Sequence, residues 1–110
     1  MREILFRAKE EPYEGWVEGY LVGPKHIGNW VECHPINPET IGQFTGLTDK
    51  NGKKIYEGDI LALRTKRPHI VKFEDGGFVL TGTAIPIRHA DKFEVIGNIH
   101  DNPELLEERQ

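Results

Sequence analysis

The chain has 110 residues and a formal net charge of −4, with 37% hydrophobic and 29% charged residues, which are the proportions of a globular protein with one modest core. It contains no apolar run near the roughly 20 residues that a membrane span needs. A single cysteine excludes an intrachain disulfide and favours a reducing, cytoplasmic location. The negative charge argues against a protein that coats nucleic acid or an anionic membrane with its whole surface.

The first third of the chain reads as short strands separated by turns. Ile4–Arg7 predicts one strand, and Trp16–Val22 predicts a second in which aromatic and small apolar residues alternate. A third strand is expected over His26–Cys33. Pro35 and Pro38 then predict an extended, non-helical connection, because each restricts its own backbone and that of the residue before it.

The middle of the chain contains the clearest turn signals. Thr40–Thr45 resumes strand character, and Asn51-Gly52 predicts a tight hairpin turn of the primed type, because both residues tolerate positive φ. Glu57-Gly58-Asp59 predicts a second turn, in which Asp59 accepts backbone N–H groups, leading into a strand over Ile60–Leu63. The sequence therefore predicts short strands folded sharply on one another.

A second hairpin follows, with Ile70–Phe73 and Phe78–Thr81 as its strands and Asp75-Gly76-Gly77 as its turn. Between 82 and 91 no strand is assigned, since Pro86 excludes a central strand position. Phe93–Ile99 predicts a further strand.

The C-terminal segment has the pattern of a helix start. Asn102 is expected as the cap, Pro103 at the first helical position and Glu104 at the positive end of the helix dipole. So short a helix does not survive alone, and Leu105 and Leu106 must therefore pack on other residues.

Taken together, the elements predict a mainly β fold: a small SH3-like barrel with additional short strands and a short C-terminal helix. We expect a single domain over residues 1–110. The segment 35–40 offers a subdivision between an N-terminal β segment and a C-terminal barrel.

Three blocks of the sequence resemble one known family. They are Arg2 to Arg7, Gln43 to Ile60, and Glu94 to Leu106, and the central block carries the most ordered matches. In these blocks the chain resembles the YopX family of phage and prophage proteins. The resemblance implies a largely β protein with an SH3-like C-terminal part and a gene carried by a phage or prophage. It implies no reaction and brings no catalytic residues, so the central block reads first as a folding motif of turns.

The sequence shows no catalytic constellation. A nucleophile with its base, or two poised carboxylates, is not visible at any recognisable spacing. Cys33, His34 and His26 do not make a metal site, because a zinc centre needs four ligands and adjacent strand residues point to opposite faces. We therefore expect a protein that is not an enzyme and uses neither a metal nor a cofactor.

The charges are distributed unevenly along the chain. Residues 50–72 carry seven Lys and Arg against two Asp and Glu, between segments of net charge −4 and −5. Two readings stay open for this basic segment. It can be a solvated surface, or it can bind a polyanion through loops of a small β-barrel. The candidate contacts for nucleic acid are Lys50, Lys53, Lys54, Arg64, Lys66, Arg67 and Lys72.

The favoured function is a non-enzymatic module that self-associates or binds a host or phage protein. The alternating charge segments and the strand edges of a short-stranded domain point to this function. Nucleic-acid binding through the basic segment is the alternative, and a membrane partner is not expected. The candidate interface residues are Trp16, Tyr20, Trp30, Leu105 and Leu106, of which the three aromatic residues also suit base stacking.

Overall fold

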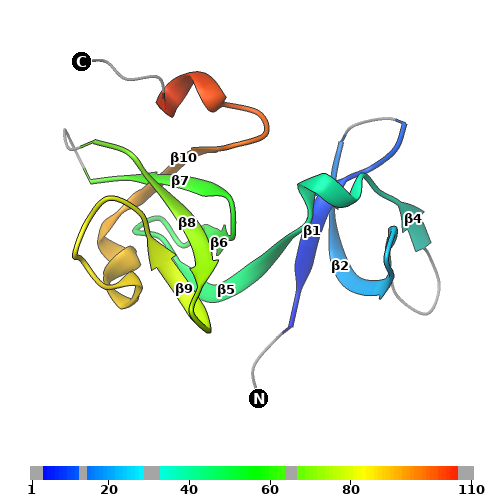
Figure 1. Cartoon of the computed structure of the whole chain (residues 1–110), viewed down its shortest axis with the longest axis horizontal. Helices are drawn as coiled ribbons and strands as arrows, with labels where there is room; N and C mark the ends of the chain where they lie inside the picture. Colours follow the sequence, from blue (N-terminus) through cyan, green and yellow to red (C-terminus); the bar gives the residue numbers. More distant parts are fainter. Residues whose placement is uncertain (1–3, 13–14, 29–32, 64–66, 107–110) are drawn as a thin grey trace. The chain divides into compact units, whose positions relative to one another are not determined.

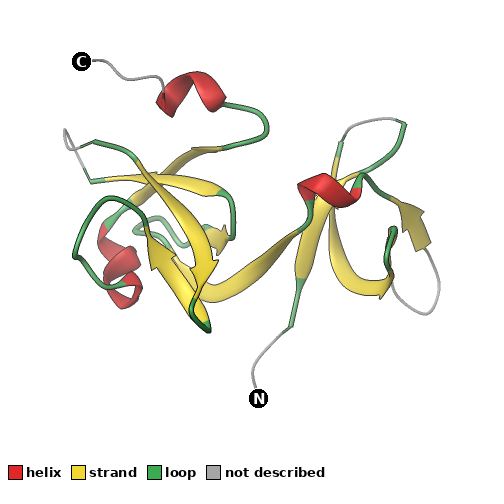
Figure 2. Cartoon of the chain, viewed as in Figure 1, coloured by secondary structure: helices red, strands yellow, loops and turns green. Residues whose placement is uncertain are grey.

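The computed structural model describes residues 4–12, 15–28, 33–63 and 67–106. The fold is mainly β, with two antiparallel sheets and short 3-10 helices, as Figures 1 and 2 show. The chain divides into two compact units, Met1–Phe44 and Thr45–Gln110. In the described residues no helix is both long and apolar enough to cross a membrane.

The first unit contains β1 to β4 of a six-stranded sheet, which has the strand order β4-β3-β2-β1-β5-β6, with β6 formed by Lys54–Tyr56. Phe6 pairs with Gly19 and Lys9 with Trp16 between β1 and β2, while Arg7 pairs with Gly42 of β5. The elements are β1 (Phe6–Lys9), β2 (Trp16–Gly23), β3 (His26–Gly28), β4 (Cys33–Pro35), η1 (Pro38–Thr40) and β5 (Gly42–Thr48), which passes into the second unit.

One face of this sheet forms the core of the first unit. Ala8, Ile27 and Ile36 are buried, and Phe6, Val17 and Ile41 pack against them. Because Ala8 pairs with Val17, their side chains share a face. The opposite face carries the alternating residues of β1 and β2.

Two expectations for this unit are wrong. A single strand over His26–Cys33 does not form: β3 and β4 lie antiparallel, with Ile27 opposite His34 and His26 opposite Pro35. Pro35 fits there because an end strand does not need its N–H. Pro38 does not extend the chain either. It opens η1, where its fixed φ suits the first helical position and Asn37 Oδ1 accepts the N–H of Glu39 at 3.0 Å.

The second unit contains a four-stranded sheet with the open order β10-β7-β8-β9. Ile55, Leu61, Val71, Leu80, Ala90 and Phe93 form its core. Because β9 and β10 end the order, the described residues show no closed barrel. The elements are β6 (Lys54–Tyr56), β7 (Asp59–Ala62), β8 (His69–Glu74), β9 (Gly77–Leu80), η2 (Ile87–Lys92), β10 (Glu94–Asn98) and η3 (Pro103–Leu106).

The two expected hairpin turns differ in type. At the Asn51-Gly52 turn only Gly52 has a positive φ, of 82°, and its N–H donates to Asp49 O at 3.0 Å. This is a longer loop closed by a glycine in the left-handed region, so the expected primed turn is wrong there. Asp75 (53°) and Gly76 (85°) both have positive φ, so the primed turn joins β8 to β9.

Two short helices complete the second unit. The segment without an assigned strand forms η2, preceded by Pro86, with Ala90 buried in the core. At the C-terminus the described residues form the single 3-10 helix η3, and residues 107–110 lie outside the description. Leu105 and Leu106 are half-buried.

Candidate functional site

The structure distributes the basic segment over several elements. Lys50 and Lys53 are exposed in the turn between β5 and β6, Lys54 begins β6, and Lys72 is exposed on β8. Lys50 Nζ lies 3.9 Å from Glu94 Oε1, so part of its charge is balanced. Arg67 is exposed just before β8, and the remaining candidates, Arg64 and Lys66, lie outside the described residues.

Asp49 connects the turn between β5 and β6 to β10 through hydrogen bonds, a contact that the sequence did not predict. Its Oδ1 accepts the N–H groups of Asn51 at 2.8 Å and Lys53 at 2.9 Å, and its Oδ2 accepts the N–H of Val95 at 2.9 Å. The N–H of Lys50 donates to Phe93 O at 2.9 Å. Val95 of β10 is thus bonded to a carboxylate, and Phe93, which precedes β10, is bonded to a turn residue.

These contacts set the ionisation of Asp49. Burial alone raises the pKa of this carboxyl group, but the N–H groups of Val95, Lys53 and Asn51 and the charge of Lys53 together lower it below the ordinary value. Asp49 therefore holds its proton less tightly than a free aspartate. Its three backbone bonds account for its burial, and they identify a structural role.

Asp59 has the turn role that the sequence predicts. It is buried, and its Oδ2 accepts the N–H of Tyr56 at 2.8 Å across the turn between β6 and β7. Gly58, with a φ of 93°, donates to Val71 O at 2.8 Å and accepts from the N–H of Ile99 at 2.9 Å. This turn therefore joins two other parts of the second unit.

Asn98 and Asn102 organise the end of β10. Asn98 Oδ1 accepts the N–H groups of His100 and Asp101, both at 2.9 Å. Asn102 Oδ1 accepts the N–H of Asn98 at 3.2 Å instead of capping the helix that follows, so the expected capping role gives way to a bond back to the strand. Gly97 permits this approach, because a Cβ built there lies 2.5 Å from Asn102 Oδ1.

The aromatic candidates lie on the first unit. Trp16 is half-buried on β2, Tyr20 is exposed on the same strand, and Trp30 lies outside the described residues. Arg7 Cζ lies 4.7 Å and Lys9 Nζ 5.7 Å from the centroid of the Trp16 ring. Sequence reasoning missed both cations, because the predicted strand Ile4–Arg7 ends before Lys9, whereas β1 extends to Lys9.

The histidines serve local contacts. His34 Nδ1 lies 3.0 Å from Glu10 Oε2, which links β4 to the residue that follows β1. His69 Nδ1 lies 2.6 Å from Thr81 O beside the β8–β9 hairpin. Within residues 4–12, 15–28, 33–63 and 67–106, no group of three or more His, Cys, Asp and Glu side chains is placed to hold a metal ion.

One comparison with known proteins shows the family, and a second gives a solved structure of similar fold. The family model described as YopX protein matches residues 6–107. The chain is also similar to a solved structure, protein EF1440 from Enterococcus faecalis, with 28% sequence identity and a TM-score of 0.69. The likeness covers 97% of this chain and 100% of that one. No curated protein matches the sequence.

Proposed function

The chain belongs to the YopX family, and from that premise we propose that it is a non-enzymatic module that self-associates or binds another protein. The proposal includes a phage or prophage gene and a place of action in the host cytoplasm. It also includes an SH3-like arrangement for the unit Thr45–Gln110. The pairing of Asp49 and Lys50 with β10 supports this arrangement.

The observation that carries the proposal is a group of apolar side chains on the surface of the first unit. Leu21 on β2 is 40% exposed, and Ile4 is 54% exposed. The register that pairs Phe6 with Gly19, continued by two residues, places Ile4 opposite Leu21. Single exposed apolar residues are ordinary, but neighbouring ones mark interaction surfaces. We call Ile4 and Leu21 the β2 patch.

The buried polar side chains support a non-enzymatic function. In the described part of the chain these are Thr40, Asp49, Asp59 and Asn98, and each is hydrogen-bonded to the backbone. Catalysis needs groups that face a substrate with a base or acid in reach. Side chains occupied with the backbone of turns stabilise the fold instead.

A second copy of the chain is the first partner to consider. A two-fold contact places the same apolar residues of both copies against each other, so one patch suffices. The acidic and basic segments of the sequence can also pair between copies. A two-fold contact through this patch is self-complementary in apolar area.

Sedimentation or light scattering over a wide concentration range tests self-association. We expect the mass to rise with concentration, and Ile4→Ser with Leu21→Ser to shift that rise to higher concentration. Phe73→Ser is the matched control, since Phe73 is 50% exposed in the second unit. A monomer at every concentration contradicts self-association. Binding to another protein is then tested by comparing wild-type and Leu21→Ser bait in phage-infected cells.

A further inference from the structure

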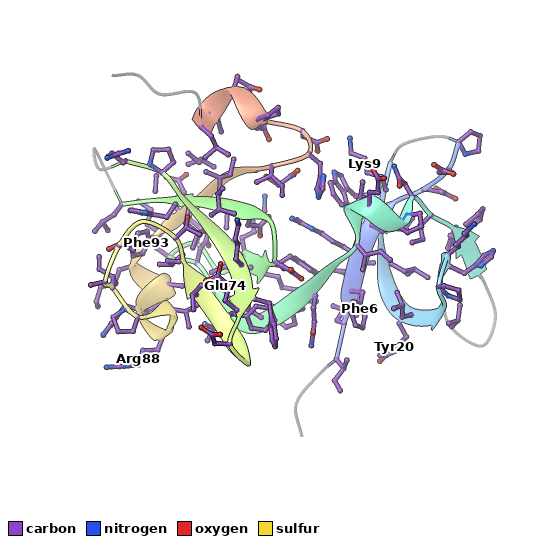
Figure 3. The ribbon with its side chains drawn as sticks, in the orientation of Figure 1. Phe6, Lys9, Tyr20, Glu74, Arg88 and Phe93 are labelled. Atoms are coloured by element: carbon purple, nitrogen blue, oxygen red, sulfur yellow. The ribbon has the colours of Figure 1, made fainter. Side chains whose placement is uncertain are left out.

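The first unit has a second surface, on the face of β1 and β2 opposite its core. Because Arg7 pairs with Glu18 and Lys9 with Trp16, these four side chains share one face, and Tyr20 follows them by strand alternation. Figure 3 labels Lys9 and Tyr20 toward opposite ends of the β1–β2 pair. We call Arg7, Lys9, Trp16, Glu18 and Tyr20 the Trp16 face.

The cations of this face are held in place by an aromatic ring. Arg7 and Lys9 are half-buried, and their head groups lie 4.7 Å and 5.7 Å from the centroid of Trp16. Cation–π contacts of this kind restrict long side chains that otherwise sample many rotamers. Two positive groups are therefore preorganised side by side on a sheet surface.

Tyr20 adds an exposed ring to the same face. It is 54% exposed and lies opposite Gly28 of β3, which has no side chain to cover it. Trp16 and Tyr20 are four residues apart on one strand, which corresponds to roughly 13 Å. The face thus offers positive groups near one end and an open aromatic ring near the other.

We propose that the Trp16 face binds single-stranded nucleic acid. Arg7 and Lys9 contact phosphates, and Tyr20 stacks on a base, which is how sheet surfaces bind single strands without reading their sequence. Trp16 positions the two cations. This site is different from the basic segment 50–72, and it does not depend on the self-association proposed above.

The charges predict weak and salt-sensitive binding. Residues 1–44 carry seven Asp and Glu against four Lys and Arg, and Glu18 lies directly opposite Arg7 on the face itself. The local cations must therefore act against an acidic background. Two phosphate contacts give a slope of log K against log salt of about −1.4 for a single strand. Raising the salt from about 50 to about 200 mM then lowers the affinity about sevenfold.

Fluorescence anisotropy with a labelled oligo-dT tests the proposal, with circular dichroism to verify that each variant is folded. We expect Lys9→Gln to weaken binding and to reduce the salt slope by about 0.7, because one phosphate contact is lost. Tyr20→Ser is expected to weaken binding about tenfold. Glu18→Gln is expected to strengthen it, since a carboxylate near the phosphates is removed.

Lys72→Gln is the matched control, because Lys72 is an exposed strand lysine in the second unit. We expect it to leave the affinity within about twofold of wild type. Absence of binding at low salt overturns the proposal, and so does an equal loss with Lys72→Gln and Lys9→Gln. Polyglutamate that competes as well as the oligonucleotide, with no effect of Tyr20→Ser, also overturns it and identifies an acidic protein as the ligand.

Discussion

The two units of the chain differ in where most of their hydrogen-bonding and charged side chains lie. In the second unit Asp49, Asp59 and Asn98 are buried and bond to backbone N–H groups of turns and strand ends. In the first unit Arg7, Lys9 and Glu18 lie on an open sheet face beside aromatic residues. Among the described residues, the second unit thus buries three polar side chains that fix its turns and strand ends, while the first buries only Thr40 and carries charged side chains on the sheet face opposite its core.

The two cores also differ in extent. Among the described residues, the buried core of the first unit consists of Ala8, Ile27 and Ile36, while that of the second has six residues, including Leu61 and Phe93. Short, sharply turned strands around the second core bury backbone groups that need side-chain partners. In the first unit β1 and β2 pair regularly from Phe6 opposite Gly19 to Lys9 opposite Trp16.

The largest expected effect comes from removing the buried carboxylate of the second unit. Asp49→Ala leaves the N–H groups of Asn51, Lys53 and Val95 without their acceptor. We expect a loss of about 3 kcal/mol in the free energy of unfolding, measured by urea denaturation. Lys50→Gln is the control, because its ion pair with Glu94 is half-exposed and contributes at most about 0.5 kcal/mol. Equal losses in the two variants contradict the inward role of Asp49.

Gly97→Ala is expected to have the next largest effect. The added Cβ lies 2.5 Å from Asn102 Oδ1 and 2.8 Å from its Cγ, so the bond from Asn98 to Asn102 must break or the strand must move. We expect a loss of about 2 kcal/mol in the free energy of unfolding. Gly77→Ala is the matched strand control, since nothing lies within 4 Å of its added Cβ. A loss in the control as large as that of Gly97→Ala argues against the Asn102 contact.

Acid provides a smaller, graded test of the same region. The folded-state pKa of Asp49 lies below its ordinary value of 3.8, so the unfolded chain binds the proton more readily. The stabilisation is therefore complete above pH 3.8 and is lost as the pH falls through the folded-state pKa. When the free energy of unfolding is measured as a function of pH, the difference between wild type and Asp49→Asn should become smaller below pH 3.8. A difference that stays constant through this range contradicts the assignment.

The sequence predicted the parts of the fold that depend on local rules. The alternation of side chains predicted β2. The glycines predicted the turns at Gly52, Gly58 and Gly76, because a left-handed backbone favours glycine whatever surrounds it. The role of Asp59 was equally local, since its partner Tyr56 lies three residues away. Local chemistry was sufficient in each case.

Other features depend on contacts that no local rule contains. Asp49 bonds to Val95, 46 residues further along the chain, and the sequence gives no sign of that pairing. Asn102 stands at the position of a helix cap in the sequence, but its side-chain oxygen accepts the N–H of Asn98 instead. Arg7 and Lys9 became candidates only when the register placed them around Trp16. Pairing between strands therefore determines which side chains form a site.

The smallest expected effect on stability is at the outward-facing residues of the first unit. It distinguishes residues that stabilise the fold from residues that are available to a ligand. Tyr20 is 54% exposed, so Tyr20→Ser removes little buried area and should change the free energy of unfolding by no more than about 0.5 kcal/mol. Urea denaturation measures this directly. A loss of several times that size shows that Tyr20 belongs to the core of its unit, and the Trp16 face is then part of the fold. If Tyr20→Ser leaves the free energy of unfolding unchanged but weakens oligonucleotide binding, Tyr20 serves ligand binding and not the stability of the fold.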